Sequence, residues 1–204
     1  MGILSSSVSI TRYRVQGKID NPVISTVETA LKKNTILEID NEDSDKTIGW
    51  TSFETPFTPN FEGSSFMIGT HFIFSMRIDK KSIPNKIIQK NIAVETKKKL
   101  DATGRKFLSK NEKKEIKDHV IHMLSLRIPA TPNVYDLIWN YEDGILLFFS
   151  NLKNSNEELE TLFSKSFKLT LVRLFPFSMA QLTAGLSQKE KDDVEKISPA
   201  VFSN

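Results

Sequence analysis

One stretch of the sequence constrains the fold more than any other: FMIGTHFIFSMRID, residues 66–79. Its apolar side chains occupy even positions, at Phe66, Ile68, Phe72, Phe74, Met76 and Ile78. Its polar side chains occupy odd positions, at His71, Ser75, Arg77 and Asp79. Successive side chains of a β-strand point to opposite faces of a sheet. The alternation therefore predicts a strand with one face against a hydrophobic core, and Gly69 marks a bend or bulge in it.

The residues before this strand predict a strand, a helix and a second strand. Residues 5–17 alternate as a strand does, with one break of register, and end at Gly17. Residues 21–34 have the spacing of a short amphipathic helix, with Pro22 suited to its first turn. A polar, acidic loop follows at 37–46, and residues 48–53 predict a short strand that carries Trp50.

Two helices are expected after Pro84. Residues 85–102 have helical spacing through Ile88, Ile92 and Leu100, and Gly104 ends the pattern. Ser109 followed by Glu112 is a capping-box signature, which predicts a second helix from Lys110 to about Leu126. The apolar side of that helix consists of Ile116, Val120, Met123 and Leu124.

The last part of the chain again predicts a sheet. Residues 135–141 alternate as a strand, residues 142–144 (Glu-Asp-Gly) form a hairpin turn, and residues 145–149 are a central return strand, apolar on both faces. Ser155 and Glu158 resemble another capping box, ahead of a helix with an apolar face from Leu159 to Phe167. Residues 168–175 predict a final strand, and the tail from Ser178 is helical and then charged.

This order predicts an α+β fold with two small sheet-forming lobes joined by a basic two-helix segment. The expected divisions are an N-terminal α+β lobe at 1–82, the basic helical segment at 83–128, a C-terminal hairpin-helix-strand lobe at 129–180 and a charged helical tail at 181–204. A chain of 204 residues with 39% hydrophobic content can bury a core of its own.

Charge is distributed unevenly along the chain. The net charge is only +3, but residues 77–117 hold 14 Lys and Arg against 5 Asp and Glu, so that this segment is +9 and the remainder −6. Such segregation favours an anionic partner at the basic segment. Two other interpretations remain open for the same residues: a pair of solvated helix faces, or a protein-interaction module that docks an acidic partner.

No catalytic constellation is evident. The chain has no cysteine, no Gly-x-Ser-x-Gly elbow and no phosphate-binding glycine loop. His119 and His122 could clamp a metal, but no third ligand follows at a useful spacing. Glu95 and Lys97 form a Glu-x-Lys element that some metal-dependent nucleases use. We therefore expect a non-enzymatic protein without metal or cofactor, and a metal-dependent exonuclease centred on Glu95 and Lys97 is the alternative.

Two features that the sequence lacks, cysteine and a long apolar run, predict the cellular compartment. The absence of cysteine fits a reducing environment, and no apolar run reaches the roughly 18 residues of a membrane span. We expect a cytoplasmic protein that does not contact membranes.

Several strings, in their order and spacing, resemble the bacterial recombination-associated RdgC family over about residues 5–180. They are IGW (48–50), FIFSMRIDKKSIP (72–84), IIQKNIAVETKKKL (87–100), GRKFLSKNEKKEIKDHVIHMLSLR (104–127), GILLFFSN (144–151), ELETLFSKSF (158–167) and LVRLFPFS (171–178). The resemblance implies a ring-shaped homodimer that encircles double-stranded DNA without sequence specificity, associates with the nucleoid and restrains a RecA-type recombinase. Family members have also been labelled exonucleases.

The resemblance also implies a basic lining that contacts phosphates, with Arg127 at the end of the second basic helix. The DNA-binding residues expected on this basis are Lys80, Lys81, Lys90, Lys97, Lys98, Lys99, Arg105, Lys106, Lys110, Lys113, Lys114, Lys117 and Arg127. Contacts of this kind give salt-dependent binding with little sequence selectivity.

Overall fold

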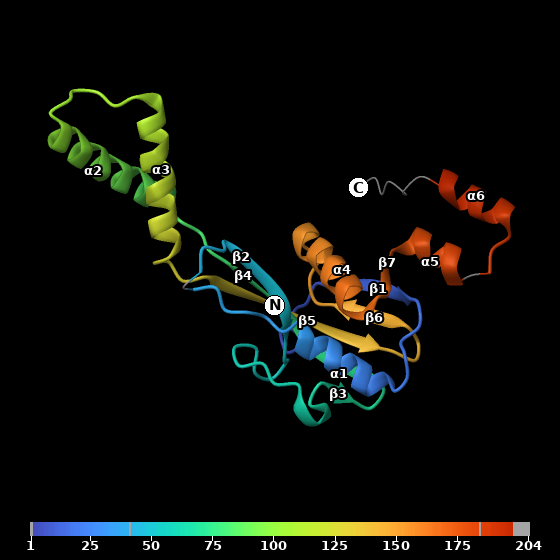
Figure 1. Cartoon of the computed structure of the whole chain (residues 1–204). Helices are drawn as coiled ribbons and strands as arrows, with labels where there is room; N and C mark the ends of the chain where they lie inside the picture. Colours follow the sequence, from blue (N-terminus) through green and yellow to red (C-terminus); the bar gives the residue numbers. More distant parts are fainter. Residues whose placement is uncertain (1, 41, 184, 198–204) are drawn as a thin grey trace.

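The computed structural model describes residues 2–40, 42–183 and 185–197 and contains one seven-stranded sheet flanked by helices (Figure 1). The strands are β1 (Thr11–Gln16), β2 (Lys46–Thr51), β3 (Met67–Ile68), β4 (His71–Lys80), β5 (Thr131–Asn140), β6 (Ile145–Phe148) and β7 (Thr170–Leu174). The helices are α1 (Val23–Lys33), the 3₁₀ helix η1 (Glu62–Ser64), α2 (Asn85–Thr103), α3 (Lys110–Ser125), α4 (Lys153–Phe167), α5 (Pro176–Thr183) and α6 (Gln188–Lys196).

The predicted α+β class is confirmed, but the strands of the two expected lobes form a single sheet. Its order is β2-β4-β5-β6-β1-β7, with β3 added against β4, and all these strands pair in antiparallel fashion. Strands β4 and β5 pair from His71 opposite Asn140 to Lys80 opposite Thr131. The basic helices are therefore an insertion between two neighbouring strands, because the chain leaves the sheet after Lys80 and returns opposite it.

One face of the sheet carries the core. Helices α1 and α4 pack on it, and the predicted inward residues of β4 and β5, such as Phe74 and Trp139, are buried there. Trp50 of β2 meets Phe74 edge-on, with ring centroids 5.1 Å apart, and Phe167 of α4 lies 5.8 Å from Trp50. Each such large buried side chain contributes on the order of 2–3 kcal/mol. Helix α4 therefore packs against strands from both halves of the chain.

The opposite face of β4 is also buried, which the alternating pattern did not predict. Arg77 and Asp79 are only 4% and 1% exposed. Arg77 donates from Nε to Asp79 Oδ1 at 2.7 Å and from Nη2 to Glu38 Oε1 at 2.8 Å, and the ring of Phe57 lies 5.6 Å from its guanidinium carbon. Loops before and after β2 supply Glu38 and Phe57, so Arg77 belongs to a buried ion network within the sheet.

Helix α4 begins earlier than predicted. Its N-cap is Leu152, and Ser155 lies within the first turn, where it is buried and bonds to Ser150 Oγ at 2.8 Å. Glu158 instead forms an ion pair with Lys46. The predicted capping box at Ser155 is therefore wrong, because Ser155 lies inside the helix and Glu158 pairs with a residue of a distant strand. The apolar face from Leu159 to Phe167 is confirmed. Within the described residues, no helix is both long and apolar enough to cross a membrane.

Candidate nucleic-acid interface

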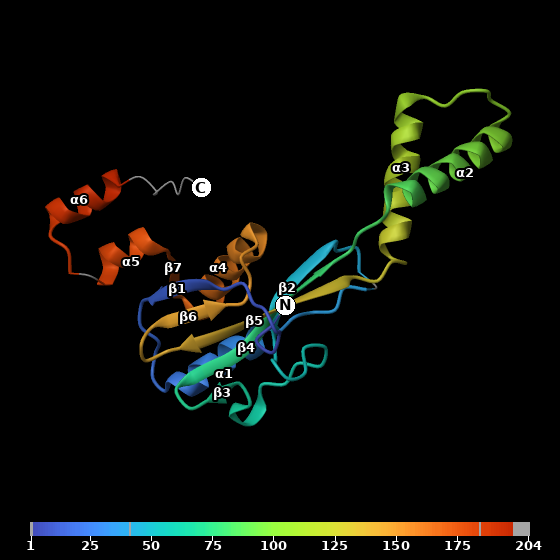
Figure 2. The same cartoon turned by 180° about the vertical axis from the view of Figure 1, so that it is seen from behind.

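The two basic helices form a helical hairpin that projects from the end of the sheet. We call residues 85–125, which comprise α2, α3 and the loop between them, the helical hairpin. In Figures 1 and 2 it stands away from the sheet and from the other helices, attached through the ends of β4 and β5. Residues 85–127 carry twelve Lys and Arg against five Asp and Glu, a net charge of +7. The most basic part of the chain therefore projects away from the sheet into solvent.

Local sequence signals set the bounds of both helices, as predicted. Gly104 caps α2 in the left-handed conformation with φ 66°, which glycine adopts without a steric penalty. The Ser109 side chain accepts from the Glu112 amide, and Glu112 accepts from the Ser109 amide at 2.8 Å, so the predicted capping box is present. These contacts, with the amide of Ser109 as the main cause and Arg105 second, lower the pKa of Glu112 to about 2.

The helical hairpin has a small core of its own. Leu108, Ile116 and Val120 are buried, and apolar side chains of α2, including Ile88 and Ile92, pack against them. No residue of α2, which is described along its whole length, is itself buried. The hairpin therefore holds its two helices together through one apolar seam and leaves the rest of their surfaces to polar and charged side chains.

A buried lysine fixes the root of the helical hairpin. Lys81 is 5% exposed, and its Nζ donates to the carbonyl oxygens of Glu42 at 2.6 Å, Ser125 at 2.8 Å and Asp40 at 3.2 Å. A lysine with all three donors used inside the protein cannot face a phosphate. The assignment of Lys81 to the DNA-binding set is therefore wrong, because this side chain connects the end of α3 to the loop before β2.

A second contact supports the same root. His122 Nδ1 lies 2.9 Å from Asp43 Oδ1, and Ser125 Oγ donates to the same oxygen at 3.1 Å. The hydrogen bond from His122, followed by that from Ser125, lowers the pKa of Asp43. His122 thus connects α3 to the acidic loop, and no group of three potential metal ligands occurs anywhere in the described part of the chain.

Nine of the thirteen predicted cations are exposed and have no ion-pair partner among the described residues. Lys80 lies at the end of β4, and the other eight lie on the helical hairpin or directly after it. The nine are Lys80, Lys90, Lys97, Lys106, Lys110, Lys113, Lys114, Lys117 and Arg127. Their charges are available to an anionic partner.

The remaining three predicted cations have acidic neighbours within the helical hairpin. Lys98 pairs with Glu95 at 2.7 Å, Arg105 Nη2 pairs with Glu112 at 2.6 Å, and Lys99 lies 3.7 Å from Glu115. At least one side chain of each pair is exposed, so each pair contributes at most about 1 kcal/mol. A polyanion could displace such partners at little cost, but the free cations are the stronger candidates for phosphate contacts.

The Glu-x-Lys element of the nuclease alternative does not form a joint site. Residues two apart on a helix do not face each other, and Glu95 bonds to Lys98 rather than to Lys97. Glu95 lines a cavity of about 320 Å³ between α2 and α3, together with Lys98, His119 and Arg127. Glu95 also lines a neighbouring cavity with Glu115 and His119, but Lys98 and Lys99 lie in the same cavity and no group of three potential metal ligands occurs among the described residues.

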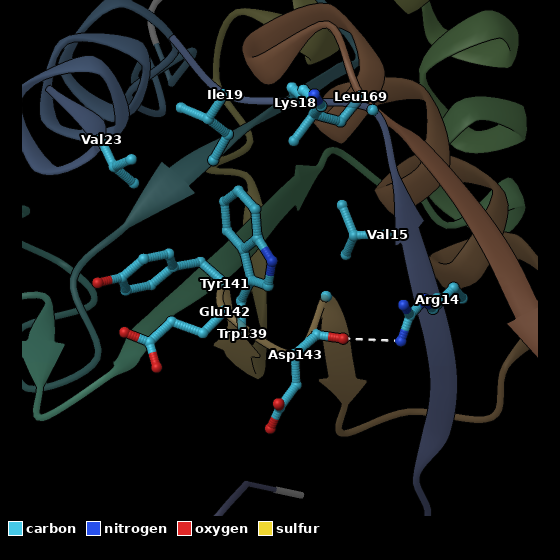
Figure 3. Close-up of a pocket in the computed structure, with 12 residues that line it drawn as sticks. Arg14, Val15, Lys18, Ile19, Val23, Trp139, Tyr141, Glu142, Asp143 and Leu169 are labelled. Atoms are coloured by element: carbon cyan, nitrogen blue, oxygen red, sulfur yellow. Dashed lines mark hydrogen bonds between the residues drawn. The ribbon is translucent and has the colours of Figure 1, made fainter. Parts of the chain in front are cut away.

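A separate cavity of about 350 Å³ lies at the far end of the sheet from the helical hairpin (Figure 3). It is bounded by β1, the segment between β1 and α1, and the turn between β5 and β6. Trp139 and Val15 line it with apolar surface, and Arg14 Nη1 donates to the backbone oxygen of Asp143 at 2.7 Å. Its lining includes two cations and two carboxylates but no serine, cysteine or histidine. This cavity adds nothing to the basic surface.

Comparison with known proteins finds one family model that spans both the sheet and the helical hairpin. The family model described as "RdgC: Putative exonuclease, RdgC" matches residues 9–192 of the 204-residue chain. No match was found among the curated proteins. The matched range includes every strand of the sheet and the whole helical hairpin, so it covers the sheet and the basic insertion together. The chain therefore belongs to the RdgC family.

Proposed function

We propose that the protein binds double-stranded DNA without sequence specificity, through the helical hairpin. The observation that carries this proposal is a group of nine exposed cations, the eight predicted ones on the hairpin and at Arg127 together with Lys86, that lack ion-pair partners in the described part of the chain. Eight of the nine are lysines. A lysine contacts a phosphate as a point charge and does not read bases. Such a surface gives affinity without sequence selectivity.

The shape of the hairpin supports the same proposal. Its two helices share an apolar seam and are anchored at one end only, so its flanks and tip are open to a partner as large as a duplex (Figure 2). A small anion would need a closed pocket with converging donors, whereas a duplex presents one charge per roughly 1.7 Å of its axis and can meet cations spread along a helix.

The test is a binding titration against two linear duplexes of unrelated sequence across a salt series. If about five of the free cations contact phosphates, the slope of log affinity against log salt is about −4.5, which corresponds to a loss of roughly 500-fold between 50 and 200 mM salt. We expect equal affinities for the two duplexes. A protein that binds neither duplex at 50 mM salt would refute the proposal.

We further propose, from the family relationship, that the protein acts as a homodimer and modulates RecA-dependent recombination at the nucleoid. The mass of the purified protein in solution tests the first point, and strand exchange by a RecA-type recombinase with and without the protein tests the second. A monomeric mass at the concentrations where DNA is bound would exclude the dimer. If strand exchange at saturating protein were unchanged, the regulatory role would be excluded.

A further inference from the structure

A second basic surface lies on the body of the protein, at the root of the helical hairpin. A groove of about 470 Å³ runs between the ends of β2, β4 and β5 and the first turn of α4. We call it the basic groove. Its charged residues are Lys46, Lys80, Lys153 and Glu158, and Ile78 and Tyr135 are among its other lining residues. Three lysines against one glutamate give it a net positive charge.

Two of these lysines lie close enough to repel each other. Lys46 of β2 lies directly opposite Lys80 of β4 in the antiparallel register, and side chains at opposite positions point to the same face. Like charges in such a pair repel. Glu158 pairs with Lys46, and Lys80 has no ion-pair partner among the described residues. In the groove, the charge of Lys46 is therefore paired with a carboxylate, whereas the charge of Lys80 is not.

The start of α4 adds to the positive potential. Lys153 is its first residue, and its Nζ lies 3.8 Å from Glu157, a pair in which Lys153 is 84% exposed. The N-cap Leu152 provides no side-chain cap for the first amides of the helix. The positive end of the α4 dipole therefore points toward the lysines of the groove.

The groove is continuous with the proposed DNA-binding surface. Lys80 is the last residue of β4, and α2 begins five residues later, at Asn85. In both Figure 1 and Figure 2 the strand β2 lies between the helical hairpin and α4. A duplex along the helical hairpin would therefore meet the groove at the point where the hairpin joins the sheet.

We propose that the basic groove contacts backbone phosphates of the same DNA that the helical hairpin binds, with Lys46, Lys80 and Lys153 as the contacting side chains. This inference rests on the proposed function. Lysines bind phosphates as point charges, and because Lys80 directly precedes the helical hairpin, the backbone of a duplex on the hairpin is the polyanion that these lysines can reach. Two contact surfaces on the protein would fix the orientation of the duplex relative to the sheet.

The experiment compares salt slopes of three proteins on one duplex. The double variant Lys46→Gln, Lys153→Gln removes two charges from the groove and none from the helical hairpin. The control Lys33→Gln, Lys165→Gln removes two exposed, unpaired lysines from the last turns of α1 and α4. We expect the slope of the groove variant to fall by about 1.8 and its affinity at 0.1 M salt to fall at least tenfold, with the control close to wild type.

A third variant tests the groove in the opposite direction. Glu158→Gln leaves Lys46 without its partner and should tighten binding and steepen the slope. Thermal unfolding of each variant verifies that the fold is intact. If wild type binds DNA but the groove variant and the control have the same slope, and Glu158→Gln has no effect, the groove inference is refuted while the proposed function stands. If wild type does not bind DNA, both are refuted.

Discussion

Replacement of Lys81 by methionine tests whether this lysine stabilises the fold or contacts DNA. In a basic sequence Lys81 looks like its neighbours, but its ammonium group donates to three backbone carbonyls, of Asp40, Glu42 and Ser125, and is 5% exposed. Methionine preserves most of the volume of the side chain and removes the charge and the three donors. The variant therefore tests the hydrogen bonds rather than the packing.

The expected loss of stability follows from these contacts. A hydrogen bond from a charged donor contributes about 1.5–3 kcal/mol, and a buried carbonyl left without a donor costs about 1–3 kcal/mol. The Ser125 contact is fully buried, whereas those to Asp40 and Glu42 are partly buried, so water can replace the lysine there. The net change should be about 3 kcal/mol, because the desolvation penalty of the ammonium group is removed at the same time. For a chain of this length, such a loss lowers the melting temperature by roughly 6–12 °C.

Urea unfolding measures the effect, with Lys114→Met as the control. Lys114 is exposed and unpaired in the described structure, so its substitution should change the unfolding free energy by no more than about 0.5 kcal/mol. Where DNA binding is measurable, Lys81→Met should leave the salt slope unchanged and Lys114→Met should reduce it by about one. If Lys81→Met had wild-type stability and a reduced slope, the placement of Lys81 at the root of the hairpin would be refuted.

Four further predictions concern the helical hairpin. Charge reversal at Lys113 and Lys114 together should weaken duplex binding at least tenfold while thermal unfolding is unchanged, because both side chains are exposed; an unaltered Kd would exclude this side of α3 from the interface. Val120→Ala should cost about 1–2 kcal/mol in chemical denaturation, and hydrogen exchange should accelerate in α2 and α3 only, since Val120 belongs to the separate apolar seam. The pKa of Glu112 is lowered to about 2 in the folded protein, so its contribution to stability is complete above its ordinary pKa and is lost as pH falls toward 2; Glu112→Gln should flatten stability across that range, and an unchanged pH profile would contradict the capping contact. Linear DNA incubated with Mg²⁺ or Mn²⁺ should be cleaved no less by Glu95→Ala than by wild type, because Glu95 and Lys97 do not face one another; cleavage that the variant abolishes would support the nuclease alternative.

The bounds of the basic helices were predictable because their signals are local. The glycine at 104 and the Ser109–Glu112 capping box each act within a few residues of the helix end they define. The apolar periodicity of β4 and of α4 was equally readable, since burial of one face dominates both elements. By contrast, Ser155 and Glu158 matched the same capping pattern but do not form a cap, because α4 begins before Ser155 and Glu158 contacts Lys46 of a distant strand.

The sequence alone determined the element types, the charge segregation and the family resemblance, all of which depend on the order of residues along the chain. Tertiary structure decided which strands pair, so that two expected lobes became one sheet through β4 and β5. It also decided which cations are free. Lys80 and Lys81 are adjacent in sequence, yet one faces solvent and the other is buried against a loop some 40 residues away. The physical reason is that neighbouring residues of an extended chain point in opposite directions, and the environment on each side is supplied by distant segments.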